Sequence, residues 1–333
     1  MKTGILLINL GTPDSPGVKD VRKYLREFLS DPYVVDTHPI IRWLLLNFII
    51  LPLRPKRSAH AYQSIWTTEG SPLLINSKAL AEGAQALLGQ DYCIALGMRY
   101  GKPSIATAIE HLKGCERLII LPLFPQYSSA ATQTAIEKAQ SVAKHNWADD
   151  KIKIIREFYC LPSFIDKTVK IIRASLGMHP VEKILFSYHG LPQRQVRKIC
   201  HANNICDMHR ACSDITTMNR DCYRAQCFAT SKALATALNL DADQYMTTFQ
   251  SRLGRIPWIE PYTDRTLERL SIDGVKRIAI VCPSFIVDCL ETLEEIGIRA
   301  RRQWQALGGE HLSLIPCINQ DADWIRDVIK ATV

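Results

Sequence analysis

Short apolar runs alternate with longer amphipathic segments along most of the 333-residue chain. Many of the runs end at Gly or Pro, which is typical of buried strands. The predicted strands are Ile5–Leu10, Tyr92–Met98, Arg117–Leu123, Ile152–Phe158, Lys183–Tyr188, Tyr245–Phe249, Arg277–Cys282 and Leu312–Pro316. Helical spacing of apolar residues predicts helices over Val18–Leu29, Ser77–Leu88, Ser104–Leu112, Ala131–Lys144, Asp166–Leu176, Ala225–Leu238 and Leu290–Leu307. Strands that alternate with helices predict an α/β fold with parallel sheets covered on both faces.

Three segments of the first half have counterparts in the second half, in the same order. The pairs are Ile5–Leu10 with Ile184–His189, Arg99–Pro103 with Arg252–Pro257, and Glu116–Pro125 with Lys276–Phe285. We therefore predict two similar Rossmann-like halves, residues 1–165 and 166–333, with a C-terminal helix that could pack back on the first half. Ligands of open α/β sheets bind beyond the carboxyl ends of the strands, so the expected site is a cleft between the halves.

One apolar segment, Trp43–Leu53, is about half as long as a membrane-spanning helix. Cationic side chains flank it at Arg42, Arg54, Lys56 and Arg57. Two interpretations stay open. The segment is either a core helix or, within residues 40–57, an apolar lip that touches a membrane or admits an apolar ligand.

The composition is that of a globular protein, with 47% apolar and 22% charged residues and a net charge of +8. The positive excess is dispersed, which favours anionic small molecules or an acidic membrane surface and does not indicate nucleic acid. No Gly-rich phosphate loop follows any predicted strand. The first apolar run is too short for a signal peptide, so we expect a cytoplasmic protein, peripheral at the inner membrane if the lip binds lipid. The oligomeric state stays open.

His189 follows a predicted strand and precedes Gly190, where a side chain faces a ligand site. Imidazole moves protons near neutral pH and binds divalent metals, although a structural histidine is the commoner case. Glu291 and Glu295 share a helix face at i, i+4, and Asp288 and Glu291 share one at i, i+3. These acids are either a solvated first helical turn or a row of oxygen ligands for a divalent cation.

The chain resembles the ferrochelatases, which insert ferrous iron into a porphyrin. The matching motifs are LLINLGTPDSP (6–16), SIWTTEGSPLL (64–74), GMRYGKPS (97–104), LPLFPQYSSA (121–130), LFSYHGLPQR (185–194), TFQSRLGRIPWIEPYTD (248–264) and FIVDCLETLEEIGI (285–298). They run through nearly the whole chain in order. The resemblance implies a chelatase-type fold and a metal chelatase, classed as a lyase, of the Gram-negative protoporphyrin type.

The resemblance also implies roles for single residues. His189 would accept pyrrole protons or meet the iron, with Glu291 as its acidic partner and Glu295 as the next carboxylate along a proton or metal path. The positions that would line the porphyrin pocket or hold its propionates are Leu10, Tyr62, Ser71, Arg99, Tyr100 and Tyr127. Cys289 stands where many members have a histidine, and a thiol does not simply replace imidazole as a proton carrier.

The implied reaction is the insertion of Fe²⁺ into protoporphyrin IX, the last step of haem synthesis. Two other functions stay open. One is a chelatase for another tetrapyrrole or metal, such as coproporphyrin, or sirohydrochlorin with cobalt or nickel. The other is a non-catalytic sensor of haem or iron.

Five of the 11 cysteines fall between Cys200 and Cys227, mostly in a segment, residues 195–222, that looks like an insertion relative to other ferrochelatases. Four thiolates suit an iron–sulfur cluster or a structural zinc. Some ferrochelatases carry a [2Fe-2S] cluster, which favours that cofactor. The predicted ligands are Cys200, Cys206, Cys212 and Cys222, with Cys227 as a substitute and with His201 and His209 as further ligands for zinc.

Overall fold

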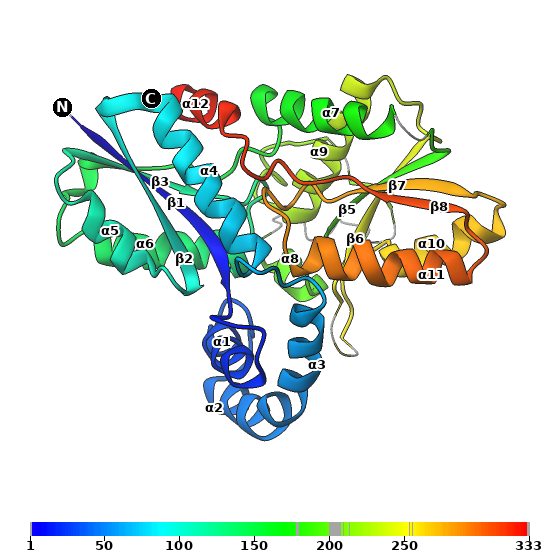
Figure 1. Ribbon diagram of the computed structural model, residues 1–333, viewed down its shortest axis with the longest axis horizontal. Coiled ribbons are helices and arrows are strands. Elements are labelled where there is room, and N and C mark those ends of the chain that lie inside the picture. The colour runs from blue at the N-terminus through cyan, green and yellow to red at the C-terminus, as the bar shows by residue number, and fades with distance from the viewer. Residues whose placement is uncertain are drawn as a thin grey trace. The chain divides into compact units, whose positions relative to one another are not determined.

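The computed structural model describes residues 2–177, 180–199, 208, 210–212, 214–252, 254 and 256–331. It divides into two compact units, each with its own sheet (Figure 1). Unit 1 consists of Met1–Phe124, Ser128–Glu157 and Asn319–Val333, and unit 2 of Pro125–Tyr127 and Phe158–Ile318. The chain therefore passes from unit 1 to unit 2 near Phe158 and returns to unit 1 for its last residues.

The described strands form one parallel sheet in each unit, with the orders β2-β1-β3-β4 and β6-β5-β7-β8. In unit 1 the strands are β1 (Thr3–Thr12), β2 (Tyr92–Gly101), β3 (Arg117–Pro122) and β4 (Ile152–Ile154). In unit 2 they are β5 (Lys183–His189), β6 (Tyr245–Gln250), β7 (Arg277–Val281) and β8 (His311–Leu314). The two sheets thus repeat one strand order, which confirms the predicted pair of similar α/β halves.

Helices bury the sheet of unit 1. Its helices are α1 (Val18–Ser30), α2 (Pro39–Leu44), η1 (Leu45–Ile50), α3 (Leu51–Gln63), α4 (Pro72–Leu88), η2 (Gly89–Asp91), α5 (Ile105–Leu112), η3 (Ser129–Gln133), α6 (Thr134–Ala143), η4 (Asp149–Lys151) and α12 (Asp323–Lys330). Apolar side chains of α5 and α6 pack against Leu6 and Ile8 of β1. Ile5 and Leu7 point to the other face of the strand and are equally buried. Both faces of β1 are therefore covered, which explains its nearly unbroken apolar run.

Unit 2 is built in the same way. Its helices are α7 (Pro162–Leu176), α8 (Gln193–Ile199), α9 (Tyr223–Leu238), α10 (Thr263–Ile272), η5 (Glu291–Ala300) and α11 (Arg301–Ala306). Leu267 of α10, Ile296 of η5 and Trp304 of α11 pack with Leu185 and Ile280 of the sheet. This core fixes η5, whose first residue is Glu291, relative to β5, which ends at His189.

An irregular connection follows the second strand of each sheet, and it shows which residues of the two units correspond. In unit 1 the Met98 N–H donates to the Pro103 carbonyl oxygen at 2.7 Å. In unit 2 the Phe249 N–H donates to the Pro261 carbonyl oxygen at 2.8 Å. Pro103 therefore corresponds to Pro261.

This correspondence corrects one of the three predicted sequence matches. Arg99 follows Met98, and Gln250 follows Phe249, so Gln250 is the counterpart of Arg99. The similarity of the two sequence motifs indicates Arg252 instead. The connection of unit 2 is longer than that of unit 1, and its additional residues shift the alignment of the two sequence motifs. At this corresponding position, unit 1 thus has an arginine and unit 2 has a glutamine.

The apolar segment 40–57 is helical but is not a core helix. Seven of the ten exposed large apolar side chains among the described residues lie there, with exposed fractions from 45% to 73%: Ile40, Ile41, Trp43, Leu44, Phe48, Ile49 and Leu53. Leu46 and Leu51 point inward and are buried. Figure 1 shows α1, α2 and α3 grouped beyond the end of β1. Among the described helices, none is long and apolar enough to cross a membrane.

Candidate active site

His189 is the last residue of β5, and hydrogen bonds hold it on both sides. Its Nδ1 lies 2.6 Å from the Gly190 carbonyl oxygen. A carbonyl oxygen only accepts, so this contact puts the proton on Nδ1 and leaves the Nε2 lone pair to act as a base or a metal ligand. The ring is half-buried, with Phe285 packed edge-on at 6.4 Å between ring centroids.

The main chain of His189 is also fixed. Its N–H donates to Ser284 Oγ at 3.2 Å, and its carbonyl oxygen accepts from the Tyr223 hydroxyl at 2.8 Å. Burial raises the pKa of Tyr223 well above its usual value, so its hydroxyl stays protonated and remains a donor. These contacts restrict the directions in which the imidazole can point.

Glu291 and Glu295 lie on η5, whose turns are wider than those of an α-helix because its hydrogen bonds run from residue i to i+5. The two residues are four apart and lie within one turn of each other. Asp288 precedes the helix, where it is buried and accepts from Thr292 Oγ1 at 2.9 Å. Both glutamates therefore lie on one helix, whereas Asp288 lies before it and accepts a hydrogen bond from a residue of its first turn.

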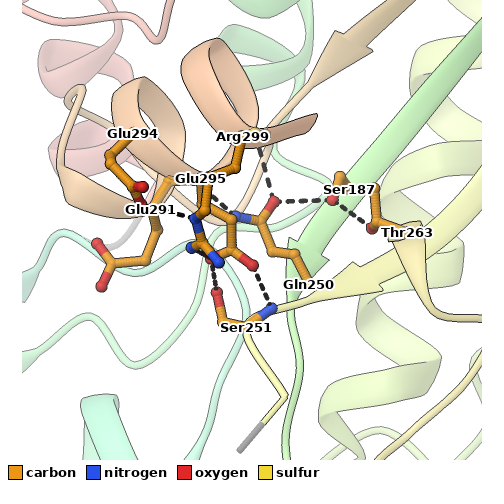
Figure 2. Close-up of polar contacts among 9 residues, drawn as sticks. Ser187, Gln250, Ser251, Thr263, Glu291, Glu294, Glu295 and Arg299 are labelled. Carbon is orange, nitrogen blue, oxygen red and sulfur yellow. Dashed lines mark hydrogen bonds and ion pairs between the residues drawn. The ribbon is translucent and has the colours of Figure 1, made fainter. Parts of the chain in front are cut away.

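The two glutamates differ in their surroundings (Figure 2). The Glu295 carboxylate points toward Ser251, whose N–H donates to Oε1 at 2.9 Å and whose hydroxyl donates to Oε2. The Glu291 carboxylate points away from that contact, while the main-chain carbonyl of Glu291 accepts from Gln250 Nε2 at 2.8 Å. The Glu295 carboxylate is thus held by hydrogen bonds to Ser251, whereas the Glu291 carboxylate is not held by these residues.

Burial raises the pKa of Glu295 above its usual value. The hydrogen bonds from Ser251 and the charges of Arg299 and His189 act against this shift. The side chain of Glu295 is 19% exposed, and Arg299 Nη2 lies 3.7 Å from its Oε2. A carboxyl with a raised pKa takes up a proton more readily than an ordinary glutamate and can pass it on.

Two predicted pocket residues of unit 1 are held by hydrogen bonds or aromatic contacts. Ser71 is buried directly before α4, and its hydroxyl accepts from Thr12 Oγ1 at 2.8 Å. Tyr62 of α3 is buried edge-on against Tyr24 and Trp66. Leu10 is half-buried on β1. These three residues help to shape unit 1, and no described contact gives them a chemical role.

Arg99 and Tyr100 share a buried partner, Asp31, which the sequence motifs do not reveal. Arg99 Nη2 forms an ion pair with Asp31 Oδ2 at 2.5 Å, and its Nε donates to Thr134 Oγ1 at 2.8 Å. The Tyr100 hydroxyl donates to the same Asp31 oxygen at 2.9 Å. The Arg99 side chain is only 17% exposed, so much of its donor capacity serves this buried network.

Tyr127 and Cys289 are both buried in unit 2. The Tyr127 N–H donates to Gln226 Oε1 at 2.7 Å. Burial and the nearby charge of Glu291 raise the pKa of the Cys289 thiol well above its usual value. The residue at the position where the resemblance implies a histidine is therefore a neutral thiol, which cannot act as a base near neutral pH.

Of the predicted cluster ligands, Cys200 and Cys206 lie outside the described residues, as do His201 and His209. Cys212 is half-buried and Cys222 and Cys227 are buried, and none of the three forms a disulfide with another described cysteine. Cys212 Sγ accepts from Arg224 Nη1 at 3.0 Å. Within the described part of the chain, no three Cys, His, Asp or Glu side chains are grouped so as to hold a metal.

A cavity of about 660 Å³ lies in unit 1. Thr12, Lys23, Glu27, Lys78 and Lys102 are among its lining residues. None of the residues predicted to carry chemistry or to line the porphyrin pocket borders it. Its lining includes both acids and lysines.

Comparison with known proteins covers the whole chain. The family model described as Ferrochelatase matches residues 2–333. A ferrochelatase of Coxiella burnetii (strain CbuK_Q154) is 52% identical over 331 residues, which are 99% of this chain and 92% of the relative. A ferrochelatase of Legionella pneumophila (strain Corby) is 51% identical over 330 residues, 98% of each chain.

Solved structures agree on the fold. SirB from Bacillus subtilis with Fe³⁺ has a TM-score of 0.53 at 12% identity, over 100% of this chain and 94% of that chain. The sirohydrochlorin chelatase SirB from B. subtilis subspecies spizizenii, in complex with cobalt, has a TM-score of 0.51 at 11% identity. These confirm the chelatase-type two-unit α/β fold. Because the family model spans the chain and the relatives are about half identical, the chain belongs to the ferrochelatase family of metal chelatases.

Proposed function

We propose that this protein is a lyase that inserts ferrous iron into protoporphyrin IX and so completes haem synthesis. The observation that carries the proposal is the arrangement in unit 2. His189 has Nδ1 bonded to a carbonyl and Nε2 available as an acceptor, and a positive charge on the ring once it has taken up a proton would act on the buried carboxyl of Glu295. Family membership supports the substrate class.

Metallation must remove two pyrrole protons and bring a dehydrated cation to four ring nitrogens. His189 Nε2 accepts the two pyrrole protons one after the other, since neutral imidazole is a base near neutral pH, and it passes the first to Glu295 before it takes the second. The Gly190 carbonyl and the contacts to Ser284 and Tyr223 keep the ring in one orientation while it does so. A ring held by its partners loses little additional entropy in the reaction.

The glutamates divide the remaining tasks. Glu295, with its raised pKa, takes the proton on from the imidazole. Glu291 supplies negative charge for the incoming iron. A pocket that favours a bent macrocycle over a flat one exposes the nitrogen lone pairs and so lowers the barrier to insertion.

The test is haem formation by purified protein from ferrous iron and protoporphyrin IX under anaerobic conditions. We expect His189→Ala to lower kcat by about 10²–10⁴-fold, the usual contribution of a positioned acid–base group. Glu291→Gln should also lower kcat strongly. His311→Ala, which removes another half-buried histidine of unit 2, is the matched control and should retain activity. Activity that survives His189→Ala would contradict the mechanism.

Substrate competition separates this proposal from the other two functions. Protoporphyrin IX should be metallated faster than coproporphyrin or sirohydrochlorin at equal concentration, and iron faster than cobalt or nickel. A protein that binds haem tightly but turns over none of these would instead be a sensor.

The exposed apolar side chains of residues 40–53 support peripheral membrane contact. They form one group on α2, η1 and the start of α3, with Arg54, Lys56 and Arg57 following directly in the sequence. An apolar group with cations beside it suits the boundary between acyl chains and anionic headgroups. We expect binding to vesicles that contain anionic lipid, weakened by salt, and no binding to neutral vesicles at high salt. A protein whose lip instead contacts only the porphyrin would bind neither anionic nor neutral vesicles.

We further propose that Cys200, Cys206, Cys212 and Cys222 hold a [2Fe-2S] cluster. Among the described residues, the surroundings of Arg224, which is 1% exposed, bear on this assignment. Its described partners are the carbonyl oxygens of Met208, Arg210 and Glu260, the Phe228 ring and Cys212 Sγ.

A buried guanidinium needs a compensating negative charge, and Cys212 as a thiolate provides one within the described part of the chain. Cys212 therefore fits thiolate ligation. When bound, such a cluster supplies a cross-link for the insertion and a one-electron redox centre.

The cluster is tested on anaerobically purified protein. Visible absorption with about two iron and two sulfide per chain is expected, in the stoichiometry of such a cluster. Cys212→Ser should remove it, and Cys160→Ser, at an exposed thiol of the same unit, should not. A colourless protein with one zinc per chain would contradict the iron–sulfur assignment.

A further inference from the structure

Gln250 joins the strand that carries His189 to the helix that carries Glu291. It is the last residue of β6 and lies opposite His189 in the parallel ladder. Its carbonyl oxygen accepts from the Gly190 N–H at 2.8 Å. Its side-chain Nε2 donates to the Glu291 carbonyl oxygen at 2.8 Å. Gln250 is therefore hydrogen-bonded to the residue after His189 and to the main chain of Glu291, and His189 and Glu291 are the two residues proposed to meet the iron.

The Gln250 amide is itself held. It is 4% exposed, and its Oε1 accepts from Ser187 Oγ at 2.7 Å. Ser187 in turn lies 2.8 Å from Thr263 Oγ1 (Figure 2). The Glu291 carbonyl oxygen only accepts, so the end of the amide that faces it is Nε2 and the end that faces Ser187 is Oε1. The orientation of this donor is set by the fold before any substrate binds.

Ser251 makes the second connection to η5. Its N–H and its hydroxyl donate to the two oxygens of the Glu295 carboxylate. It does so with φ at +66°, in the left-handed region that a non-glycine residue seldom adopts. Backbone strain of this kind persists where neighbouring contacts enforce it, and it concentrates at functional sites.

Gly190 allows the close approach on which this arrangement depends. A Cβ built on Gly190 would lie 2.7 Å from the Gln250 carbonyl oxygen, a distance that real Cβ atoms do not show. The strand end after His189 and the end of β6 are thus in direct main-chain contact.

We propose that Gln250 and Ser251 are positioning residues that set the separation of His189 from Glu291 and Glu295. They act through main-chain and carboxylate contacts, not through the substrate. This rests on the proposed function, in which those three side chains handle the iron and the protons. Partners that orient metal-binding and acid–base groups in this way typically change activity by 10- to 100-fold when they are lost.

The test compares kcat, KM for iron and the tetrapyrrole dissociation constant of variants with those of the wild type. Gln250→Met keeps the length of the side chain and removes its hydrogen bonds to Ser187, Glu291 and Cys282. We expect a 10- to 100-fold lower kcat with a tetrapyrrole dissociation constant changed less than about threefold. Gln85→Met is the matched control. It removes an amide that bonds to three main-chain groups of unit 1, and it should lose stability but keep kcat.

Ser251 is tested by a pair of variants. Ser251→Ala removes the hydroxyl and keeps the unusual φ, whereas Ser251→Gly removes the hydroxyl and relaxes the backbone. Equal losses of kcat of about tenfold in both variants are expected. Recovery in Ser251→Gly alone would assign the effect to strain and overturn the hydroxyl's role. Should Gln250→Met fail to fold, Ser251→Ala decides by itself.

Two results would overturn the proposal. One is a kcat within twofold of the wild type in Gln250→Met and Ser251→Ala. The other is a loss of tetrapyrrole affinity by the same factor as kcat, which would make these residues substrate contacts. Both comparisons use whichever tetrapyrrole and metal the wild type turns over. An inactive wild type would therefore refute the proposed function, whereas an active wild type with unaffected variants would refute only this inference.

Discussion

His189 and Glu291 stand out in the sequence as candidate residues because of their positions. His189 ends an apolar run and precedes a glycine, and Glu291 belongs to an acidic group after another run. Gln250 and Ser251 lie in an equally distinctive motif, but nothing in a Gln-Ser pair indicates two contacts to a helix about 40 residues later. Their importance depends on strand register and on one unusual φ, which only the fold reveals.

Glu295 leads to a prediction about stability. Its pKa is raised from 4.5 in the folded state, chiefly by burial, so the folded protein binds more protons than the unfolded chain once the pH rises above that value. Stability therefore falls as the pH rises through the raised pKa. Glu295→Gln should melt about 1–3 °C higher than the wild type at pH 7.5, while losing activity. The advantage should vanish near pH 4.

Thermal melts across this pH range check the prediction. Glu268→Gln, at an exposed glutamate of α10 paired with Arg265, serves as the control and should show no such pH dependence. A Glu295→Gln protein that is less stable than the wild type at pH 7.5 would mean that the Ser251 and Arg299 contacts outweigh burial.

At the level of elements, the strands were more predictable than the helices. Every predicted strand is present, although β4 covers only the first 3 residues of its predicted range, Ile152–Phe158. The inner strands are the easiest to predict, because a strand buried on both faces is an apolar run that ends at Gly or Pro. Helix α10 was not predicted, since its sequence is mostly polar and only a few residues such as Leu267 and Leu270 are buried. The widened turns of η5 and η1 have no sequence signature, because they depend on hydrogen-bond partners five residues apart.

The apolar segment shows how periodicity can mislead. Its residues would suit a core helix, yet α2 and η1 bury almost none of them. If the group is a membrane contact, Phe48→Ser with Leu53→Ser should weaken binding to anionic vesicles at least tenfold. Each large apolar side chain that enters the acyl boundary contributes up to about 1.5–3 kcal/mol.

Vesicle co-sedimentation measures this effect. Ile272→Ser alters an apolar side chain that is 86% exposed on another element, and it should bind like the wild type. Equal binding by the double variant and the wild type would contradict a membrane role. A raised KM for porphyrin in the double variant, with unchanged vesicle binding, would identify the lip as part of the substrate pocket.

On the scale of the whole molecule, the repeat of two halves was visible in the sequence, but its register was not. The strand-end motifs found the pairs β1 with β5 and β3 with β7. They mismatched the residues after β2 and β6, because the longer connection of unit 2 contains a second Arg-Gly-Pro-like series. Two sheets built on one plan therefore hold different chemistry at corresponding positions, an ion pair at Arg99 and an amide at Gln250.

Unit 1 depends on the end of the chain. Trp324, Ile325, Val328 and Ile329 of α12 are buried, and α12 packs on α4. Deleting residues 319–333 should lower the melting temperature of unit 1 by about 10 °C or more, because several buried side chains are lost together. Limited proteolysis should then cut within residues 1–157 before it cuts within unit 2.

Arg326→Ala is the control, since it changes only an exposed position of α12. A truncated protein in which both units become sensitive at the same temperature would show that the last helix stabilises the chain as a whole. A truncated protein that melts like the wild type would contradict the dependence altogether.

The return of the chain to unit 1 also sets the order of events during translation. Domains generally fold as they leave the ribosome, the N-terminal one first. Here Glu157 and Asn319 belong to one unit but are separated by about 160 residues, which take about 8–30 s to synthesise at 5–20 residues per second. Unit 2 can therefore assemble its sheet while unit 1 still lacks α12. The first half to be made is the last to be completed, and during that interval α4 presents an uncovered apolar face to the chaperones of the cell.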